Sequence, residues 1–196
     1  MENSACCLIR NKKEENTNYV ESLKHSNEHG DDGSFVRQKN RFSTPFGDKE
    51  GELPVEANRY RLIWAPVCPW AHRSIIVTKL LGLDKVISYG TLDPVRPEGP
   101  TSDWAFTLDK DGIDPVLKIH KLSEVYLKTD PEYTGRPTVP CVVDLKTGLV
   151  VNNDYFNLTR YWETKWTKFH KKGAPDLYPI ELRDEIDKLN DELFWG

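Results

Sequence analysis

The chain has 196 residues, of which 38% are hydrophobic and 30% charged, with a formal net charge of −4, so we expect a soluble protein with one good core and the start of a second domain. No apolar run approaches the roughly 18 residues that cross a bilayer, and the interrupted apolar stretch after Glu2 makes a poor signal peptide, so we expect a cytoplasmic protein without a membrane partner. Acidic residues are scattered throughout and leave no basic face, which argues against nucleic acid as a partner.

The four cysteines, Cys6, Cys7, Cys68 and Cys141, show no framework spacing. A reducing compartment therefore fits better than a disulfide scaffold. The same spacing argues against a zinc site, and we expect no metal.

The N-terminal quarter of the chain is poor in core residues. Residues 1–34 are rich in Asn, Glu, Lys, His and Gly and predict a disordered arm. Residues 35–58 remain irregular but contain spaced apolar side chains, Phe35, Phe42, Phe46 and Leu53. We expect this stretch to be an extended segment along the domain surface, with the core starting near Arg59.

A βαβ unit follows. The sequence predicts a buried strand over Tyr60–Trp64, a helix over Pro69–Leu81 and a second strand over Lys85–Thr91. The stretch Leu92–Pro115 contains many Pro, Gly and Asp residues and predicts an excursion loop.

The remaining elements complete one domain. A short helix is expected over Ser123–Lys128, a hairpin over Thr138–Asp144 and Leu149–Val151, and a helix over Asp154–Lys168. The order βαβ, helix, ββ, helix is typical of an α/β thioredoxin-like domain, which we place at residues 59–170.

A linker over residues 171–180 precedes the last predicted helix, residues 181–196. That helix has an apolar stripe, Leu182, Ile186, Leu189 and Leu193, and no partner helix follows it in the chain. Three explanations stay open: a dimer interface, docking on the first domain, or truncation of a larger helical domain.

Cys68 is the candidate nucleophile. It lies between a predicted strand and a predicted helix, where free backbone N–H groups and the helix dipole favour a thiolate, and Arg73 adds positive potential. Pro69 suits the first helical position, and Ala71 stands where a second cysteine would have made a dithiol. The alternative is an inert cysteine buried in the core.

Four further residues are candidates for binding a ligand. Pro140 stands at the start of a strand, and if the fold is thioredoxin-like we expect it to be a cis proline that leaves the preceding backbone groups free for a peptide-like ligand. The alternative is an ordinary trans loop proline. Asp154 and Tyr155 begin a predicted helix. Asp154 is either a cap alone, or a cap beside free N–H groups that hold a ligand carboxylate while its own carboxylate pairs a ligand ammonium. Trp104 is either a surface anchor or a lid over the site.

Four separated motifs carry a family resemblance. They are Cys-Pro-Trp-Ala-His-Arg at 68–73, Asp-Trp-Ala-Phe at 103–106, the long run through Gly-Arg-Pro-Thr-Val-Pro at 127–140, and Glu-Leu-Arg-Asp-Glu-Ile-Asp at 181–187. From Phe35 to Gly196 the chain resembles the xi-class glutathione transferases, the glutathionyl-hydroquinone reductases.

The resemblance implies a dimeric cytosolic enzyme with a glutathione transferase fold and glutathione as co-substrate. Cys68 would take glutathione from a glutathionyl-quinol and form an enzyme–glutathione disulfide, which a second glutathione resolves. The backbone of Val139 would pair with the cysteinyl part of glutathione, and cis Pro140 would hold that loop. The motifs place the other glutathione contacts at Trp104, Arg136, Pro137 and Thr138.

The chain departs from the family twice. The family has Asn-Glu-Ser where this chain has Asn153-Asp154-Tyr155, so Asp154 and Tyr155 would reshape the pocket for the glutamyl group. The family also continues past Gly196 into helices whose tyrosines protonate the quinol, so we expect weak or no quinone reduction by residues 1–196 alone. The alternatives are a glutaredoxin-like monothiol module and an inactive fragment that acts by protein association.

Overall fold

The computed structural model describes residues 31–195, except residues 33, 35, 37 and 96–102. The chain divides into two compact units, each built from two stretches: residues 1–41 with 91–138, and residues 42–90 with 139–196. The domain bounds expected from the sequence stay a prediction. Most of the expected N-terminal arm, residues 1–30 and 33, lies outside the described residues, as does Phe35. Within the described part of the chain, no helix has the length and apolar character of a membrane span.

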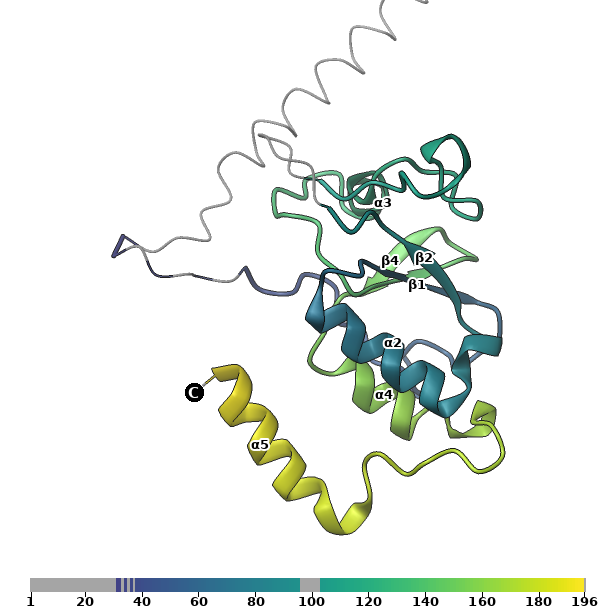
Figure 1. Cartoon of the computed structure of the whole chain (residues 1–196), viewed down its shortest axis with the longest axis vertical. Helices are drawn as coiled ribbons and strands as arrows, with labels where there is room; N and C mark the ends of the chain where they lie inside the picture. Colours follow the sequence, from purple (N-terminus) through teal and green to yellow (C-terminus); the bar gives the residue numbers. More distant parts are fainter. Residues whose placement is uncertain (1–30, 33, 35, 37, 96–102, 196) are drawn as a thin grey trace, which may run out of the picture. The chain divides into compact units, whose positions relative to one another are not determined.

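A four-stranded sheet organises the second unit (Figure 1), with the spatial order β2-β1-β3-β4. Its strands are β1 (Tyr60–Trp64), β2 (Ser88–Thr91), β3 (Cys141–Asp144) and β4 (Leu149–Asn152). Strand β3 runs antiparallel to both β1 and β4. The two central strands are almost wholly buried, which explains why both read as continuous runs of large side chains in the sequence.

Helices α2 (Pro69–Leu81) and α4 (Leu158–Thr164) pack side by side against one face of this sheet (Figure 1). Helix α2 ends at Gly82, whose φ of 80° lies in the left-handed region that glycine adopts without strain. The Gly82 N–H bonds to the carbonyls of Lys79 and Thr78, which would otherwise lack partners.

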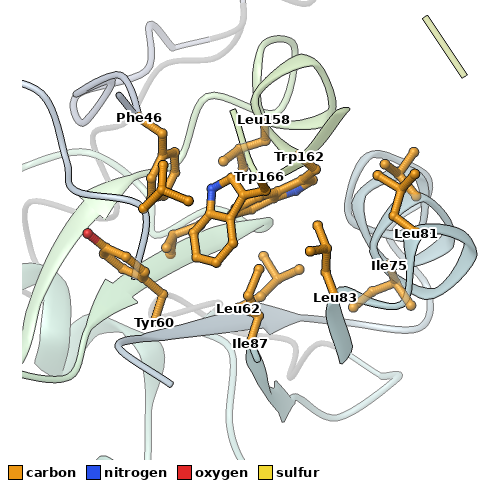
Figure 2. Close-up of a cluster of buried hydrophobic side chains, with 13 residues drawn as sticks. Phe46, Tyr60, Leu62, Ile75, Leu81, Leu83, Ile87, Leu158, Trp162 and Trp166 are labelled. Atoms are coloured by element: carbon orange, nitrogen blue, oxygen red, sulfur yellow. The ribbon is translucent and has the colours of Figure 1, made fainter. Parts of the chain in front are cut away.

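The core of the second unit is an aromatic cluster extended by aliphatic side chains from both helices (Figure 2). The ring of Phe46 meets Tyr60 edge to face at 5.1 Å, and Trp162 meets Trp166 in the same way at 5.4 Å. Phe46 is fully buried and Val55 nearly so. The expectation that the core begins near residue 59 is therefore wrong, because the preceding segment supplies a central core ring.

Most predicted elements are confirmed, several with bounds shifted by one to three residues, and two differ more in their structure. The expected strand over 85–91 is shorter, because a 3-10 turn, Leu83–Lys85, occupies its start. The expected helix over 154–168 begins only at Leu158 and is followed by a separate 3-10 turn, Thr167–Phe169. Its first four residues form a turn around the carboxylate of Asp154 instead.

The first unit contains α3 (Leu122–Thr129). It also contains a 3-10 turn, Lys110–Gly112, which lies within the expected excursion loop. Glu124 stabilises the start of α3, because its carboxylate accepts the backbone N–H groups of His120 and Lys121, both at 2.8 Å. Residues 96–102 of this loop lie outside the described residues.

The chain ends in α5 (Arg183–Trp195), which follows a 3-10 turn, Ile180–Leu182, and confirms the predicted last helix. Side chains of α5 bond to α2 and α4 of the same unit. Of the three explanations left open by the sequence, docking on the preceding elements is therefore observed. Leu189 and Leu193 of α5 are exposed.

Candidate functional site

Cys68 lies at the N-cap of α2, immediately after the short turn that follows β1. Its φ and ψ of −89° and 110° are extended, and Pro69 occupies the first helical position as predicted. The Cys68 N–H bonds to the Ala65 carbonyl at 3.0 Å, and the Cys68 carbonyl accepts the His72 N–H at 3.0 Å. The backbone on both sides of the cysteine is therefore fixed, while its side chain is half-buried.

The thiol faces the loop before β3. The Sγ atom of Cys68 lies 3.6 Å from the carbonyl oxygen of Val139, within hydrogen-bonding range for sulfur. The peptide bond between Val139 and Pro140 is cis, which confirms the expectation for this proline. Both residues are buried. The cysteine and the cis-proline loop thus meet within the second unit.

Asp154 acts as a cap for the turn that leads into α4. Its carboxylate accepts the N–H groups of Phe156 at 3.2 Å and Asn157 at 3.3 Å, and the Asn157 side-chain amide at 2.7 Å. The Asp154 N–H bonds in turn to the Asn152 side chain at 2.9 Å. The amides expected to be free for a ligand carboxylate are therefore engaged by the protein. The pairing of Asp154 with a ligand ammonium stays a prediction.

Tyr155 packs against the helix that carries the cysteine. Its ring is 5.1 Å from the ring of Trp70, centroid to centroid, and Tyr155 is only 5% exposed. Trp70 lies two residues after Cys68, so this contact joins the start of α2 to the turn before α4. Trp70 had no predicted role, although its place inside the Cys-Pro-Trp-Ala motif was a signal in the sequence.

A second aromatic contact supports the cysteine turn. The His72 ring lies 5.3 Å from the ring of Trp64, the last residue of β1. The strand before the turn and the first turn of α2 after it are thereby connected by side chains as well as backbone. This pairing could not be read from the sequence, because residues 64 and 72 belong to different elements.

The other expected glutathione contacts belong to the first unit. Trp104 is buried, and its carbonyl accepts the N–H of Leu122 at 2.9 Å, so it anchors its loop to the start of α3. Arg136 is held through its backbone, since its N–H donates to Gln38 at 2.8 Å and its carbonyl accepts the Gln38 amide at 2.6 Å. Contact between these residues and a ligand at Cys68 stays a prediction.

Thr138 and Pro137 complete this run and are both buried. The Tyr126 hydroxyl donates to the Thr138 carbonyl at 2.8 Å and lies 3.3 Å from the Thr138 N–H, which it can accept. One tyrosine thus fixes both backbone groups of Thr138, directly before the loop that faces Cys68. The described residues contain no group of three or more side chains suited to hold a metal ion.

Comparisons with known proteins place these features in one class. The chain is 35% identical over 167 residues to a glutathione S-transferase omega-like 2 of Schizosaccharomyces pombe, a match covering 83% of this chain and 52% of the relative. It is also 35% identical to the glutathionyl-hydroquinone reductase YqjG of Escherichia coli, covering 83% of this chain and 51% of that protein. No protein-family model matches the chain.

Solved structures agree. The xi-class glutathione transferase of Phanerochaete chrysosporium superimposes with a TM-score of 0.76 at 33% identity, covering 85% of this chain and 54% of that one. A glutathione transferase from Gordonia bronchialis gives a TM-score of 0.72 at 44% identity, covering 77% and 46%. The fold is the thioredoxin-like fold of glutathione transferases.

Within that class, the chain is similar over most of its own length to xi-class glutathione transferases and to relatives named glutathionyl-hydroquinone reductases. It spans about half the length of the curated relatives it matches.

Proposed function

We propose that this protein is a glutathione-dependent reductase that removes glutathione from glutathionyl-hydroquinones through Cys68. The observation that carries the proposal is the position of one cysteine at the N-cap of α2, with Sγ 3.6 Å from the carbonyl of the cis-proline loop. The thiolate is the nucleophilic form of cysteine, and a half-buried side chain leaves the sulfur accessible to a small substrate. The names of two relatives supply the substrate class.

The reaction has two steps: transfer of glutathione from the hydroquinone to Cys68, and then a thiol–disulfide exchange with a second glutathione. The Cys68 thiolate attacks the sulfur of the glutathionyl-hydroquinone; a sulfur–sulfur bond forms, the sulfur–carbon bond breaks, and the ring carbon takes the electron pair and a proton. The hydroquinone leaves. A second glutathione thiolate then attacks the glutathione sulfur of the mixed disulfide, releasing glutathione disulfide and the Cys68 thiolate.

In this proposal the backbone of Val139, beside cis Pro140, pairs with the cysteinyl part of glutathione. Asp154 receives the ammonium of the glutamyl group, and Tyr155 limits the room there because its ring is packed on Trp70. The remaining contacts are those that the family resemblance implies: Trp104, Arg136, Pro137 and Thr138. We also propose a cytoplasmic homodimer for the whole protein.

A second candidate is a glutaredoxin-like module that exchanges thiols with proteins. The residues on either side of Cys68 favour it, because Val67 is 58% exposed and Pro69 is exposed as well. A thiol in such open surroundings can reach a disulfide on a large partner.

A single-turnover experiment separates the two candidates. The protein is mixed with a glutathionyl-hydroquinone in the absence of free glutathione, and both the protein mass and the released hydroquinone are measured. Because weak quinone reduction is expected of residues 1–196 alone, the reaction is followed to completion over a long incubation. We expect slow formation of a glutathione adduct with release of an equal amount of hydroquinone, both lost in Cys68→Ser and both kept in Cys141→Ser, since Cys141 is buried. A parallel sample contains a peptide that carries a glutathione disulfide in place of the glutathionyl-hydroquinone. A glutathione adduct formed on Cys68 from the peptide but not from the glutathionyl-hydroquinone would favour the second candidate.

A further inference from the structure

The linker and α5 are attached to the second unit by polar side chains. Arg160 of α4 bonds to Asp187 of α5 at 2.5 Å, and the hydroxyl of Tyr178 in the linker donates to the other oxygen of Asp187 at 2.7 Å. Arg73 of α2 donates to the side-chain oxygen of Asn190 at 3.1 Å. The last helix is therefore held by charges and hydrogen bonds from two neighbouring helices.

A cavity of about 470 Å³ lies under this linker, and Glu163 of α4 contributes to its wall. The other walls include Ala174, Asp176, Leu177 and Tyr178 of the linker. Among the described residues, none donates a hydrogen bond to the Glu163 carboxyl group, and its charged neighbours act on it only at longer range. The linker therefore lies beside a half-buried carboxyl group that no hydrogen bond from the protein stabilises, and reduced hydration of such a group disfavours its ionised form.

Burial raises the pKa of Glu163 to about 7. The negative charge of Asp176 in the linker acts in the same direction, while Arg73 of α2 and Arg160 of α4 oppose it. The other polar or titratable groups on the cavity wall are Thr164, Thr167, His170, Tyr178 and Arg183. Arg160 is already paired with Asp187 of α5, so its positive charge stabilises the Glu163 carboxylate less than an unpaired charge would.

We propose that Glu163 makes the docking of the linker and α5 dependent on pH, with the docked state holding a neutral carboxylic acid and the ionised carboxylate favouring release. Release exposes the carboxylate of Glu163 to water. Glu163 therefore binds its proton more tightly in the docked state than in the released state. The inference rests on these contacts and is independent of the thiol chemistry at Cys68.

The sign follows from linkage. Because docking raises the affinity of Glu163 for its proton, docking is strongest below about pH 4.5, the ordinary value for glutamate, and weakens as the pH rises towards 7. The equilibrium constant for release rises by at most about tenfold per pH unit in this window. Above about pH 7, Glu163 is ionised in both states, so it no longer makes docking depend on pH.

Hydrogen exchange of α5, measured by mass spectrometry on the whole chain between pH 5 and 8, tests the proposal. Each rate is divided by that of the same peptide in unstructured form, which removes the intrinsic pH dependence of exchange. We expect protection of residues 183–193 to fall severalfold from pH 5 to 7, while protection of β1 and β3 stays level. Glu163→Gln should abolish the change and keep α5 protected at pH 8.

Two control variants keep the assignment specific. Glu185→Gln removes an exposed carboxylate of α5, and His170→Gln removes another titratable group of the cavity wall; both should retain the pH dependence. The proposal is overturned if α5 protection is independent of pH in the unmodified chain, if Glu163→Gln retains the change, or if β1 and β3 lose protection in parallel with α5.

Discussion

The cysteine turn and the last helix are held in the second unit by different kinds of interaction. Cys68 is fixed by backbone hydrogen bonds on both sides and lies at the start of a helix that contributes Ile75, Val77 and Leu81 to the core. Helix α5 is attached through polar side chains, and its Leu189 and Leu193 stay exposed. Burial of apolar surface responds little to pH or salt, whereas charged contacts near the surface respond to both.

The difference shows how one compact unit can combine a rigid reactive centre with a more easily displaced element. Local opening needs only the free energy of the contacts that are lost. Opening α5 breaks a few side-chain bonds, while moving Cys68 requires disruption of the sheet or the aromatic core. Changes to the core should therefore lower the free energy of unfolding most, and changes to the contacts of α5 should lower it least.

Removal of a core ring should destabilise the whole unit. Trp166 is fully buried between Phe46, Tyr60 and Trp162. Trp166→Ala should lower the free energy of unfolding by about 3–5 kcal/mol in chemical denaturation. Trp166→Phe should cost less, because it keeps a ring and removes an indole N–H that has no partner among the described residues. Equal losses in the two variants would contradict this account of the core.

A buried ion pair in the sheet tests whether burial or charge is decisive. Arg59 bonds to Asp144 at 2.7 Å, and the Asp144 side chain is only 3% exposed. Burial alone would raise the pKa of Asp144, but hydrogen bonds from Arg59 and from the Lys146 N–H outweigh it and hold that pKa below 3.8. Asp144→Asn should therefore lower the free energy of unfolding at pH 7 by roughly 1.5–3 kcal/mol.

The pH dependence of that loss has a definite sign. A carboxyl group with a depressed pKa stabilises the fold above its unfolded value, and this stabilisation disappears as the pH falls through the folded value. The difference between the unmodified chain and Asp144→Asn should shrink below about pH 3.8. A difference that stays constant down to pH 2 would show that the ion pair is not its source.

The smallest effect is expected at α5. Asp187→Asn removes the charge that bonds to Arg160 at the partly exposed surface, so docking should weaken by only about 0.2–1 kcal/mol. The loss should be smaller in 1 M salt, where the screening length is about 3 Å. Hydrogen exchange of α5 measures it, with the exposed Glu185→Gln as control. A loss as large as that of Trp166→Ala would erase the contrast between the two regions.

Local signals in the sequence were sufficient for the elements that position the thiol. The continuous large side chains of β1, the proline after Cys68 and the spacing of the apolar residues that follow it predicted the bounds of β1 and α2 as observed. Pro140 was correctly expected to be cis. These features depend on neighbours within a few residues, which a sequence pattern displays directly.

Features that depend on distant partners were missed or displaced. Phe46 looked like part of a surface segment because its neighbours are polar, and only the fold shows it between Tyr60 and Trp166. Asp154 was considered as a cap, but its hold on the amides of residues 156 and 157 delayed the start of α4. The cavity that Glu163 lines is formed by residues from α2, α4, the linker and α5. No local sequence pattern predicts which distant residues will line the same cavity.

The most direct test of the central claim is the mass of the protein after incubation with oxidised glutathione near neutral pH, with peptide mapping to assign the modified cysteine. We predict a glutathione adduct on Cys68 that reduced glutathione releases, that Cys141→Ser retains and that Cys68→Ser lacks. Mapping is needed because Cys6 and Cys7 can also react. The account would be contradicted if Cys68 formed no adduct while it was still readily alkylated.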